Sequence, residues 1–419
     1  MLLARVLKRM VRNGQLTVID ARGHSHVFSG TEPGPVVTIR LHDPALHWKL
    51  FFSPMLATGE AYMDGTLTVE EGDIYDLVEL GSMSMGWDIP DHWLQRLVSR
   101  IRQMLRRVAQ YNPAHRSKAN VAHHYDLSGQ LYELFLDSDR QYSCAYFADP
   151  DDDLETAQRQ KKEHLAGKLC LQPGQKVLDI GSGWGGLALH LAQATDVEVT
   201  GVTLSEEQHK VSNERAATAE VDDRVRFDLR DYRHVDGRFD RIVSVGMFEH
   251  VGVGHYDEFF GKVKELLADD GVAVLHTIGR ADGPGATDPW IRKYIFPGGY
   301  SPALSEIAPA VERAGLYITD VEVLRMHYAY TLRAWRERFL ANRKRVRELY
   351  DERFCRMWEL YLCGAECAFR YAGHVVFQVQ MAKNNTAVPD TRDYITDHDR
   401  AAAQRRRRAS QKSGDSRAA

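Results

Sequence analysis

The chain has 419 residues, of which 44% are hydrophobic and 27% are charged. This composition is typical of a globular protein, and the length exceeds what one ordinary domain core needs, so we expect two domains. The formal net charge of −4 argues against a general nucleic-acid binder. Because no run of about eighteen apolar residues occurs, the sequence also argues against a membrane-spanning helix.

The N-terminal stretch MLLARVLKRMVRNG places Arg5, Lys8, Arg9 and Arg12 among its apolar residues. A signal peptide needs an uninterrupted apolar region followed by a small-residue cleavage site. Neither is present in this stretch, so we expect a cytoplasmic protein.

The chain contains five cysteines, an odd number in a long sequence without a secretion signal. This pattern predicts thiols and not a disulfide framework. Cys363 and Cys367 lie one helical turn apart, but no neighbouring Cys or His completes a set of four zinc ligands. We therefore expect no metal site.

Residues 1–90 are expected to form a small α+β domain. Between about residues 36 and 80, short apolar runs such as VVTIRLHD and HWKLFFSP alternate with Gly and Asp turn signals. Period-2 patterns of this kind are typical of short strands. The domain is a candidate lipid-binding region.

Residues 91–120 are expected to form a basic helix and a linker. The stretch from Trp93 to Lys118 contains no acidic residue, its apolar residues recur at helical spacing, and Pro113 interrupts it. One interpretation is an interdomain helix with a solvated face. The other is electrostatic docking on anionic lipid headgroups, to which each basic residue contributes about 1 kcal/mol.

Residues 121–385 carry the α/β part of the chain. From Lys176 onward, runs such as KVLDIG, VEVTGVTL and FDRIVSVG alternate with helical patterns. This alternation predicts βαβ units and a doubly wound, mainly parallel sheet. A loop-rich insertion after Gly279 and a mostly helical excursion from about Thr331 to Tyr371 precede the final strand HVVFQVQMAK.

Residues 386–419 have a polar composition that ends in Arg405 to Arg408 among Ala, Ser and Gln. Such a segment lacks the apolar surface needed to order itself, so we expect a mostly disordered tail. The four arginines are consistent with a solvated tail, and attraction to an anionic membrane is the alternative.

The clearest chemical signal is VLDIGSGWGG at the first strand-to-helix junction. Gly181, Gly183 and Gly185 allow a tight turn and a close approach of the backbone to a ligand. The N-terminus of the following helix offers free N–H groups. This position, after a strand and before a helix, is typical of a nucleotide-like cofactor site at the carboxyl edge of a parallel sheet.

The details of this turn distinguish between cofactors. A dinucleotide site has the pattern G-x-G-x-x-G, whereas Asp179-x-Gly-x-Gly without a phosphate-binding lysine resembles motif I of S-adenosylmethionine-dependent methyltransferases. The resemblance implies the class I methyltransferase fold. The alternative is a glycine-rich turn with no ligand.

The second strand ends in Thr203-Leu-Ser and not in the acidic residue that most such enzymes place on the ribose. In this departure the chain resembles the cyclopropane fatty acid synthase family, which includes the mycolic acid cyclopropane synthases. The resemblance runs from about residue 110 to 392 and also rests on the following segments: HYDLSGQLYELFLD, QYSCAYF, VGMFEHVG, LHTIG, YIFPGG, HYAYTLRAW and VVFQVQMAK.

The resemblance implies a set of contacts to S-adenosylmethionine. Thr203 and Gln208 would reach the ribose and methionine parts, Tyr142 and Ser143 the methionine, and Asp231 with Tyr232 the adenine. The whole set is Tyr142, Ser143, Asp179, Gly181, Gly183, Gly185, Thr203, Gln208, Asp231 and Tyr232.

The resemblance also implies an unusual base. An alkene that accepts a methyl cation becomes a carbocation, so the site must exclude water and must hold a base near the new methyl group. In the family this base is thought to be a bound bicarbonate. The matching residues are Cys144, Glu249, His276, Ile278 through its backbone, and Tyr328.

Each of these residues also has a structural interpretation. Cys144 is consistent with a small buried hydrophobic residue, and His276 with a hydrogen-bonded core histidine. Glu249 follows the fourth strand at the ligand-binding edge of the sheet, which favours function. The family often has Gly-Cys-Glu where this chain has Gly364-Ala365-Glu366, so a role for that cysteine is weakened.

The resemblance implies a cyclopropane-fatty-acyl-phospholipid synthase that adds a methylene group to a cis double bond. The alternatives are a relative that makes methyl- or methylene-branched acyl chains, and a non-catalytic lipid-binding protein. The expected partner is an anionic phospholipid membrane surface, on whose inner face the protein would lie peripherally, and not nucleic acid. The oligomeric state stays open, with a homodimer as one alternative.

Overall fold

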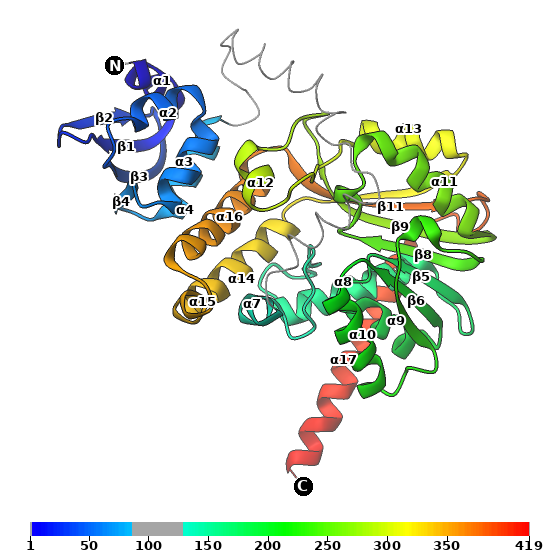
Figure 1. Cartoon of the computed structure of the whole chain (residues 1–419). Coiled ribbons are helices and arrows are strands. Elements are labelled where there is room, and N and C mark those ends of the chain that lie inside the picture. Colours follow the sequence, from blue (N-terminus) through cyan, green and yellow to red (C-terminus); the bar gives the residue numbers. More distant parts are fainter. Residues whose placement is uncertain (1, 86–128, 419) are drawn as a thin grey trace. The chain divides into compact units, whose positions relative to one another are not determined.

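The computed structural model describes residues 2–85 and 129–418 (Figure 1). It divides into two compact units. Unit 1 contains the described residues up to Leu136 together with Gly279–Leu304 and Tyr328–Val375, and unit 2 contains Asp137–Ile278, Ser305–His327 and the residues from Val376 onward. The division differs from the predicted consecutive domains because two later segments of the chain belong with the N-terminal part.

Unit 2 is built on a seven-stranded sheet with the order β10-β11-β9-β8-β5-β6-β7. The strands are β5 (Lys176–Ile180), β6 (Glu198–Thr203), β7 (Val225–Leu229), β8 (Phe239–Val245), β9 (Leu267–Arg280), β10 (Tyr317–Leu324) and β11 (His374–Ala382). Strands β7, β6, β5, β8 and β9 run parallel, and β10 pairs antiparallel with β11. The predicted doubly wound, mainly parallel α/β fold is confirmed.

Helices cover both faces of this sheet (Figure 1). On one face lie α8 (Leu154–Leu169), α9 (Gly186–Thr195) and α10 (Glu206–Thr218), and on the other lie α11 (Tyr256–Leu266) and α13 (Leu304–Ala314). The strands read as continuous apolar runs because both of their faces are buried. Val177, Val199, Val243 and Val274 all belong to one core cluster.

The expectation of a disordered tail is wrong for most of residues 386–419, because helix α17 spans Asp393–Ala418. Ile395 and Ala402 are buried. Asp399 accepts a hydrogen bond from His164 of α8 at 2.8 Å, and Arg406 pairs with Glu163. Composition did not predict this helix, because its contacts with α8 are partly buried polar pairs between residues that are distant in the sequence.

The N-terminal part of unit 1 is a four-stranded sheet with the order β2-β1-β3-β4. Its elements are α1 (Leu2–Met10), β1 (Asn13–Ile19), β2 (Ser25–Ser29), β3 (Glu32–Leu41), α2 (Leu46–Phe52), α3 (Pro54–Met63), β4 (Leu67–Glu71) and α4 (Ile74–Met85). The predicted α+β character is confirmed. The run HWKLFFSP, however, forms α2 instead of a strand.

The later segments of unit 1 are helical, as predicted for the excursion after Thr331. They comprise α12 (Pro289–Tyr294), α14 (His327–Ala341), α15 (Arg343–Leu349) and α16 (Glu352–Tyr371), which join α7 (Gly129–Phe135). Helices α3 and α4 pack against α16. The fully buried Glu366 carboxylate binds Arg336 at 3.0 Å and Arg370 at 2.8 Å, and it accepts from the Tyr75 hydroxyl of α4 at 3.4 Å.

The predicted basic helix from Trp93 to Lys118 lies outside the described residues. In the described part of the chain, no helix combines the length and the apolar character needed to cross a bilayer. No disulfide joins any of the five cysteines, all of which are described.

Candidate active site

The glycine-rich turn follows β5 and leads directly into α9. Gly181, Gly183 and Gly185 all have positive φ angles, of 86°, 55° and 83°. The N–H groups of Gly181 and Ser182 donate to the carbonyl oxygen of Val202 in β6, each at 3.0 Å. The turn is therefore held against the neighbouring strand in a backbone conformation that L side chains rarely adopt.

The three glycines differ in what surrounds them. A Cβ atom at Gly181 would lie 2.7 Å from the side chain of Met247, and one at Gly185 would lie 2.7 Å from Phe227. A Cβ atom at Gly183 would meet no atom within 4 Å. Gly183 is thus the member of the set that borders open space, as a close approach to a ligand requires.

Two polar side chains at this turn have no hydrogen-bond partner. They are Asp179 through Oδ2 and Ser182 through its hydroxyl, and both atoms are buried. Burial raises the pKa of Asp179 to about 7. Because buried polar groups are normally hydrogen-bonded, these atoms fit a ligand that supplies the missing partners.

Thr203 and Gln208, at the end of β6, are joined to each other. The Thr203 hydroxyl donates to Gln208 Oε1 at 2.9 Å, and it accepts from the N–H of Ser205 at 3.2 Å. Ser205 caps α10 by accepting from the Gln208 N–H. The sequence placed both residues at a cofactor, and the structure brings them together at the carboxyl edge next to the glycine turn.

Asp231 and Tyr232 follow β7 at the same edge. The Asp231 carboxylate binds Arg233 through two hydrogen bonds of 2.9 and 2.7 Å. Burial acts to raise its pKa, but the bonds to Arg233 outweigh burial and lower the pKa overall. The ring of Tyr232 packs edge-on against Phe259, with centroids 5.4 Å apart. Asp231 is therefore an ionised acceptor whose two oxygens are already engaged by one arginine.

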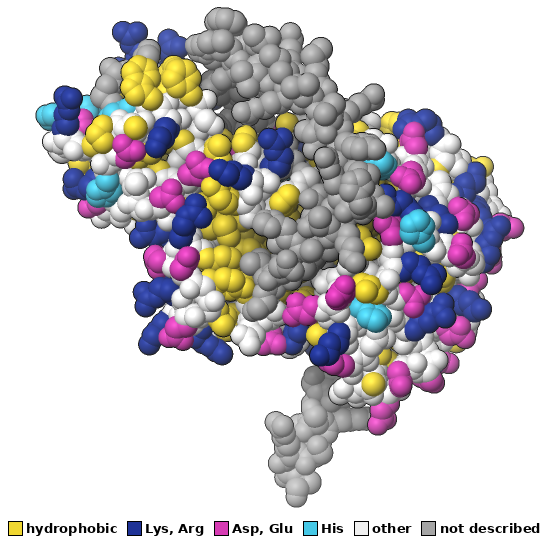
Figure 2. Space-filling view, in the orientation of Figure 1, with side chains coloured by type: hydrophobic (Ala, Val, Ile, Leu, Met, Phe, Trp, Pro, Cys, Tyr) yellow, Lys and Arg dark blue, Asp and Glu magenta, His cyan; other side chains and the backbone are white. Residues whose placement is uncertain are grey.

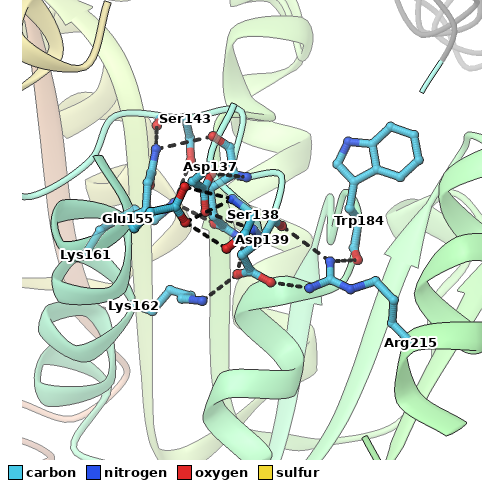
Figure 3. Close-up of polar contacts among 11 residues, drawn as sticks. Asp137, Ser138, Asp139, Ser143, Glu155, Lys161, Lys162, Trp184 and Arg215 are labelled. Carbon is cyan, nitrogen blue, oxygen red and sulfur yellow. Dashed lines mark hydrogen bonds and ion pairs between the residues drawn. The ribbon is translucent and has the colours of Figure 1, made fainter. Parts of the chain in front are cut away.

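Residues 141–144 carry Tyr142, Ser143 and Cys144, and we call them the 141–144 segment. Two side chains of α8, Gln158 and Lys161, hold this segment, and Figure 3 shows Lys161 beside Ser143. Gln158 Nε2 donates to the carbonyl oxygens of Gln141 at 3.2 Å and Ser143 at 2.9 Å. Lys161 Nζ donates to Gln141 Oε1 at 2.6 Å and to the Ser143 hydroxyl at 2.8 Å.

Lys161 is a fully buried ammonium group that donates to two uncharged acceptors, Gln141 Oε1 and the Ser143 hydroxyl. Burial lowers its pKa to about 8. The predictions from the sequence included neither Gln158 nor Lys161. They lie three residues apart, in helical register with Leu165 and Lys168, on a face that a purely apolar pattern would not reveal.

Asp139 links the start of this loop to the glycine turn (Figure 3). Its carboxylate pairs with Lys162 of α8 and with Arg215 of α10. Arg215 also donates to the carbonyl oxygen of Trp184, inside the turn, at 2.7 Å. A Cβ atom at Gly186 would collide with the Asp139 carboxylate, so this position requires glycine for packing.

Glu249 lies in the short 3-10 helix Phe248–His250 that follows β8, and His276 lies within β9, near its carboxyl end. Glu249 Oε1 accepts from the backbone N–H of Ile278 at 2.6 Å, while its Oε2 is buried without a partner. Burial raises the pKa of Glu249 to about 7. The structure therefore brings together two residues of the predicted base site, Glu249 and Ile278. The Ile278 N–H binds the Glu249 carboxylate directly.

His276 is buried on β9, where it pairs with Val245 of β8, and its side chain contacts Gln378 of β11. Its Nδ1 lies 3.1 Å from Gln378 Nε2, and its Nε2 has no partner. Burial holds the pKa of His276 well below its usual 6.5, and the positive charges of Lys161 and Lys168 lower it further. The imidazole is therefore neutral. Sequence reasoning did not assign a role to Gln378.

The two remaining predicted residues have different surroundings. Cys144 is buried, and its thiol donates to the carbonyl oxygen of Ala145 at 3.3 Å. Tyr328 belongs to unit 1, where its ring packs against Phe369 with centroids 4.8 Å apart. The structure thus groups Glu249, Ile278 and His276 within unit 2.

The groups without partners gather along the carboxyl edge of the parallel strands. Asp179 Oδ2, Ser182 Oγ, Glu249 Oε2 and His276 Nε2 are all buried. This edge is where open α/β sheets bind ligands. The open space at Gly183 and the unsatisfied acceptor of Asp179 fit the amino and hydroxyl groups of a nucleoside-like cofactor.

Comparison with known proteins supports this interpretation. Residues 113–379 match the family described as mycolic acid cyclopropane synthetase. The chain is 39% identical over 347 residues to the cyclopropane-fatty-acyl-phospholipid synthase of Escherichia coli K12, covering 82% of this chain and 87% of that protein. It is also 39% identical over 345 residues to a probable fatty acid methyltransferase of Pseudomonas putida, covering 80% and 84%.

A third relative and a solved structure agree. The tuberculostearic acid methyltransferase of Mycobacterium tuberculosis is 36% identical over 391 residues, covering 89% of each chain. The crystal structure of mycolic acid cyclopropane synthase CmaA1 with SAH and CTAB superposes with a TM-score of 0.60 at 36% identity, covering 65% of this chain and 99% of that one. The chain belongs to the cyclopropane fatty acid synthase family and is an S-adenosylmethionine-dependent methyltransferase.

Proposed function

We propose that the protein is a cyclopropane-fatty-acyl-phospholipid synthase with bound bicarbonate as its base. One observation carries the proposal: two buried side chains at the carboxyl edge of the sheet, Glu249 and His276, each keep one polar atom without a partner. Burial excludes water from both groups. A reaction that passes through a carbocation needs such a site, because water would quench the cation.

The chain's own residues would divide the work. Gly181, Gly183 and Gly185 would admit the cofactor to the backbone, and Thr203 with Gln208 would bind its ribose and methionine parts. When bound, S-adenosylmethionine supplies an electrophilic methyl group on sulfur. Glu249 and His276 would hold the base that accepts a proton from the newly added methyl carbon, and the electron pair of that C–H bond would close the ring.

Glu249 is itself the alternative base. With its pKa raised to about 7 by burial, it has the basicity suited to proton transfer at neutral pH. Removing dissolved carbon dioxide should slow the enzyme, and adding bicarbonate should restore it. Full activity in bicarbonate-free buffer, together with an inactive Glu249→Ala variant, would assign the proton transfer to Glu249.

The Glu249→Ala variant also tests the placement of the base. It should lower turnover strongly while leaving S-adenosylmethionine affinity within a few-fold, because the base acts after the methyl has been transferred. A fully active variant would contradict the assignment of Glu249, Cys144, His276, Ile278 and Tyr328 to the base site.

A methyl-branched product is the second candidate. Two relatives are named as fatty acid methyltransferases, one of them for tuberculostearic acid. Mass spectrometry of lipids from cells that express the chain distinguishes the products. A gain of one methylene unit on monounsaturated acyl chains is expected for a cyclopropane ring and also for a branched chain that keeps a double bond. Fragmentation of the modified chains then separates a ring from a branch. Loss of all modification would contradict both.

We also propose that the protein binds anionic membranes through its N-terminal part. Trp48 and Phe52 of α2 and Met55 of α3 are exposed, and hydrophobic side chains are visible at this surface (Figure 2). The exposed basic residues of this part include Arg5, Lys8, Arg9 and Arg12. Arg405, Arg407 and Arg408 of α17 are exposed as well.

Vesicle binding tests this docking. Vesicles that contain phosphatidylglycerol should bind the protein more tightly than vesicles of phosphatidylcholine alone, and the binding should weaken steeply as the salt concentration rises. Phe52→Ser should weaken binding at every salt concentration, whereas Leu349→Ser, at an exposed position on α15, should not. Equal binding to both vesicle types would contradict the electrostatic part.

A further inference from the structure

Gln378 is a buried polar side chain on β11 to which the proposed reaction assigns no role. Its relative exposure is 0%, and its Nε2 lies 3.1 Å from Nδ1 of His276. Its Oε1 has no partner, and neither does Nε2 of His276. The Gln378 amide contacts one nitrogen of His276. It is therefore positioned to control which of the two ring nitrogens carries the proton.

The direction of this hydrogen bond decides the tautomer. A neutral imidazole has one N–H donor and one lone-pair acceptor. An amide N–H can donate only to the lone pair, so His276 Nδ1 is the acceptor and the proton resides on Nε2. The opposite orientation of the amide would reverse the tautomer. It would also move the N–H donors of Gln378 to the position where Oε1 now has no partner.

The Nε2–H tautomer is complementary to the other unpartnered group. Glu249 Oε2 is an acceptor, whereas His276 Nε2–H is a donor. A hydrogen carbonate ion has negatively charged oxygens that accept hydrogen bonds and one hydroxyl that donates. One donor and one acceptor from the protein therefore match both faces of such an ion.

We propose that Gln378 is a positioning residue that holds His276 in the Nε2–H tautomer, so that His276 donates a hydrogen bond to the bound anion and does not remove a proton. The identity of the anion as bicarbonate rests on the proposed function. The tautomer itself does not, because it follows from the contact between Gln378 and His276.

Nuclear magnetic resonance of protein labelled with ¹⁵N-histidine measures the tautomer directly. The signal of His276 is assigned by its absence from a His276→Gln variant. In the wild-type protein, Nε2 should be protonated and Nδ1 should not. A protonated Nδ1 in the folded wild-type protein overturns the proposal, whatever the enzyme's activity.

Substitutions on β11 supply matched controls. Gln378→Glu replaces the donor by an acceptor of the same size, so Nδ1 should become protonated. Gln380 is equally buried on the same strand but donates to the carbonyl oxygen of Lys168 at 2.5 Å, so Gln380→Glu should leave the His276 tautomer unchanged. If both variants change the tautomer, or neither does, the proposal is wrong.

Kinetics separate positioning from structure. Gln378→Glu should lower turnover at least tenfold and leave S-adenosylmethionine affinity within threefold, while Gln380→Glu keeps turnover within threefold of the wild type. Should Gln378→Glu fail to fold, Gln378→Met removes the hydrogen bond without adding a charge, and both tautomers should then be populated. Equal turnover of the folded Gln378 and Gln380 variants would overturn the catalytic part of the proposal. Failure of the wild type to modify lipids would contradict the proposed function and leave the tautomer result intact.

Discussion

The glycine turn after β5 and the 141–144 segment, both of which we propose contact the cofactor, are held in place by different means. In the turn, backbone conformation does the work, and glycines with positive φ angles make room for a ligand. In the 141–144 segment, buried side chains of α8, Gln158 and Lys161, bind the chain in place. The glycine turn therefore depends on the absence of side chains. The 141–144 segment depends instead on polar side chains from another part of the sequence.

The largest expected effect tests the glycine turn. Gly183→Val should reduce S-adenosylmethionine affinity at least a thousandfold, because the new side chain would occupy the open space at this position. Isothermal titration calorimetry measures the affinity.

Gly174→Val is the matched control for backbone strain. Gly174 also has a positive φ angle, of 78°, and open space around its Cβ position, but it precedes β5 at the opposite edge of the sheet. Both variants should lose similar thermal stability, and only Gly183→Val should lose the cofactor. Unchanged affinity in Gly183→Val would show that the cofactor does not approach this turn.

The next effect concerns Glu249, one of whose two buried carboxylate oxygens has no partner. Because the pKa of Glu249 is raised from 4.5 to about 7 in the folded protein, the unfolded chain loses its proton first as the pH rises. Stability should therefore fall between pH 4.5 and 7, by about 3 kcal/mol for this group. Glu249→Gln should abolish that share of the decline, as urea unfolding at pH 5 and pH 8 would measure. Parallel pH profiles for the two proteins would contradict a buried Glu249 carboxylate with a raised pKa.

Two lysines of α8 sharpen the comparison further. Lys161 binds neutral acceptors, whereas Lys168, equally buried, pairs with Glu322 at 2.5 Å. Lys161→Met should weaken cofactor binding about tenfold and should cost less stability than Lys168→Met, because both hydrogen-bond acceptors that it leaves behind are uncharged. Lys168→Met should destabilise the fold by about 3 kcal/mol and leave the affinity unchanged. Calorimetry and urea unfolding on the same samples test this reversal, which fails if the two variants behave alike.

The smallest effect concerns the end of β6. Thr203→Val removes the hydrogen bond to Gln208 and should weaken S-adenosylmethionine binding about three- to fivefold, equivalent to about 0.6 to 1 kcal/mol. Thr200→Val, on the same strand but bonded to Arg226, serves as the control. Equal affinities in both variants would remove Thr203 from the cofactor site.

Local patterns predicted the parts of the molecule that are built locally. The parallel sheet follows from buried apolar strands, and the glycine turn follows from Gly181, Gly183 and Gly185, whose positions relative to β5 and α9 match the expectation. Residues whose role depends on distant partners were harder. Gln158, Lys161 and Gln378 are polar positions inside helix and strand patterns, and only the packed structure shows that each is buried.

The same reason explains the errors. The polar C-terminal segment forms α17 because His164 of α8 meets Asp399, a contact across 235 positions that composition does not encode. The run HWKLFFSP forms a helix whose Trp48 and Phe52 stay exposed, so its apolar residues do not mark a buried strand. Apolar periodicity reports burial, and it misleads where charged residues are buried or aromatic residues are not.

The contact between Tyr75 and the buried Glu366 can form only late in the synthesis of the chain. Tyr75 of α4 reaches Glu366 of α16 across 291 positions. A ribosome that adds about 5 to 20 residues per second therefore needs about 15 to 60 s after making α4 before its partner emerges. During that time the faces of α3 and α4 that will contact α16 have no partner. We therefore expect these helix faces to stay exposed until α16 has been made, and codons that slow translation between α4 and α16 should lower the yield of folded protein.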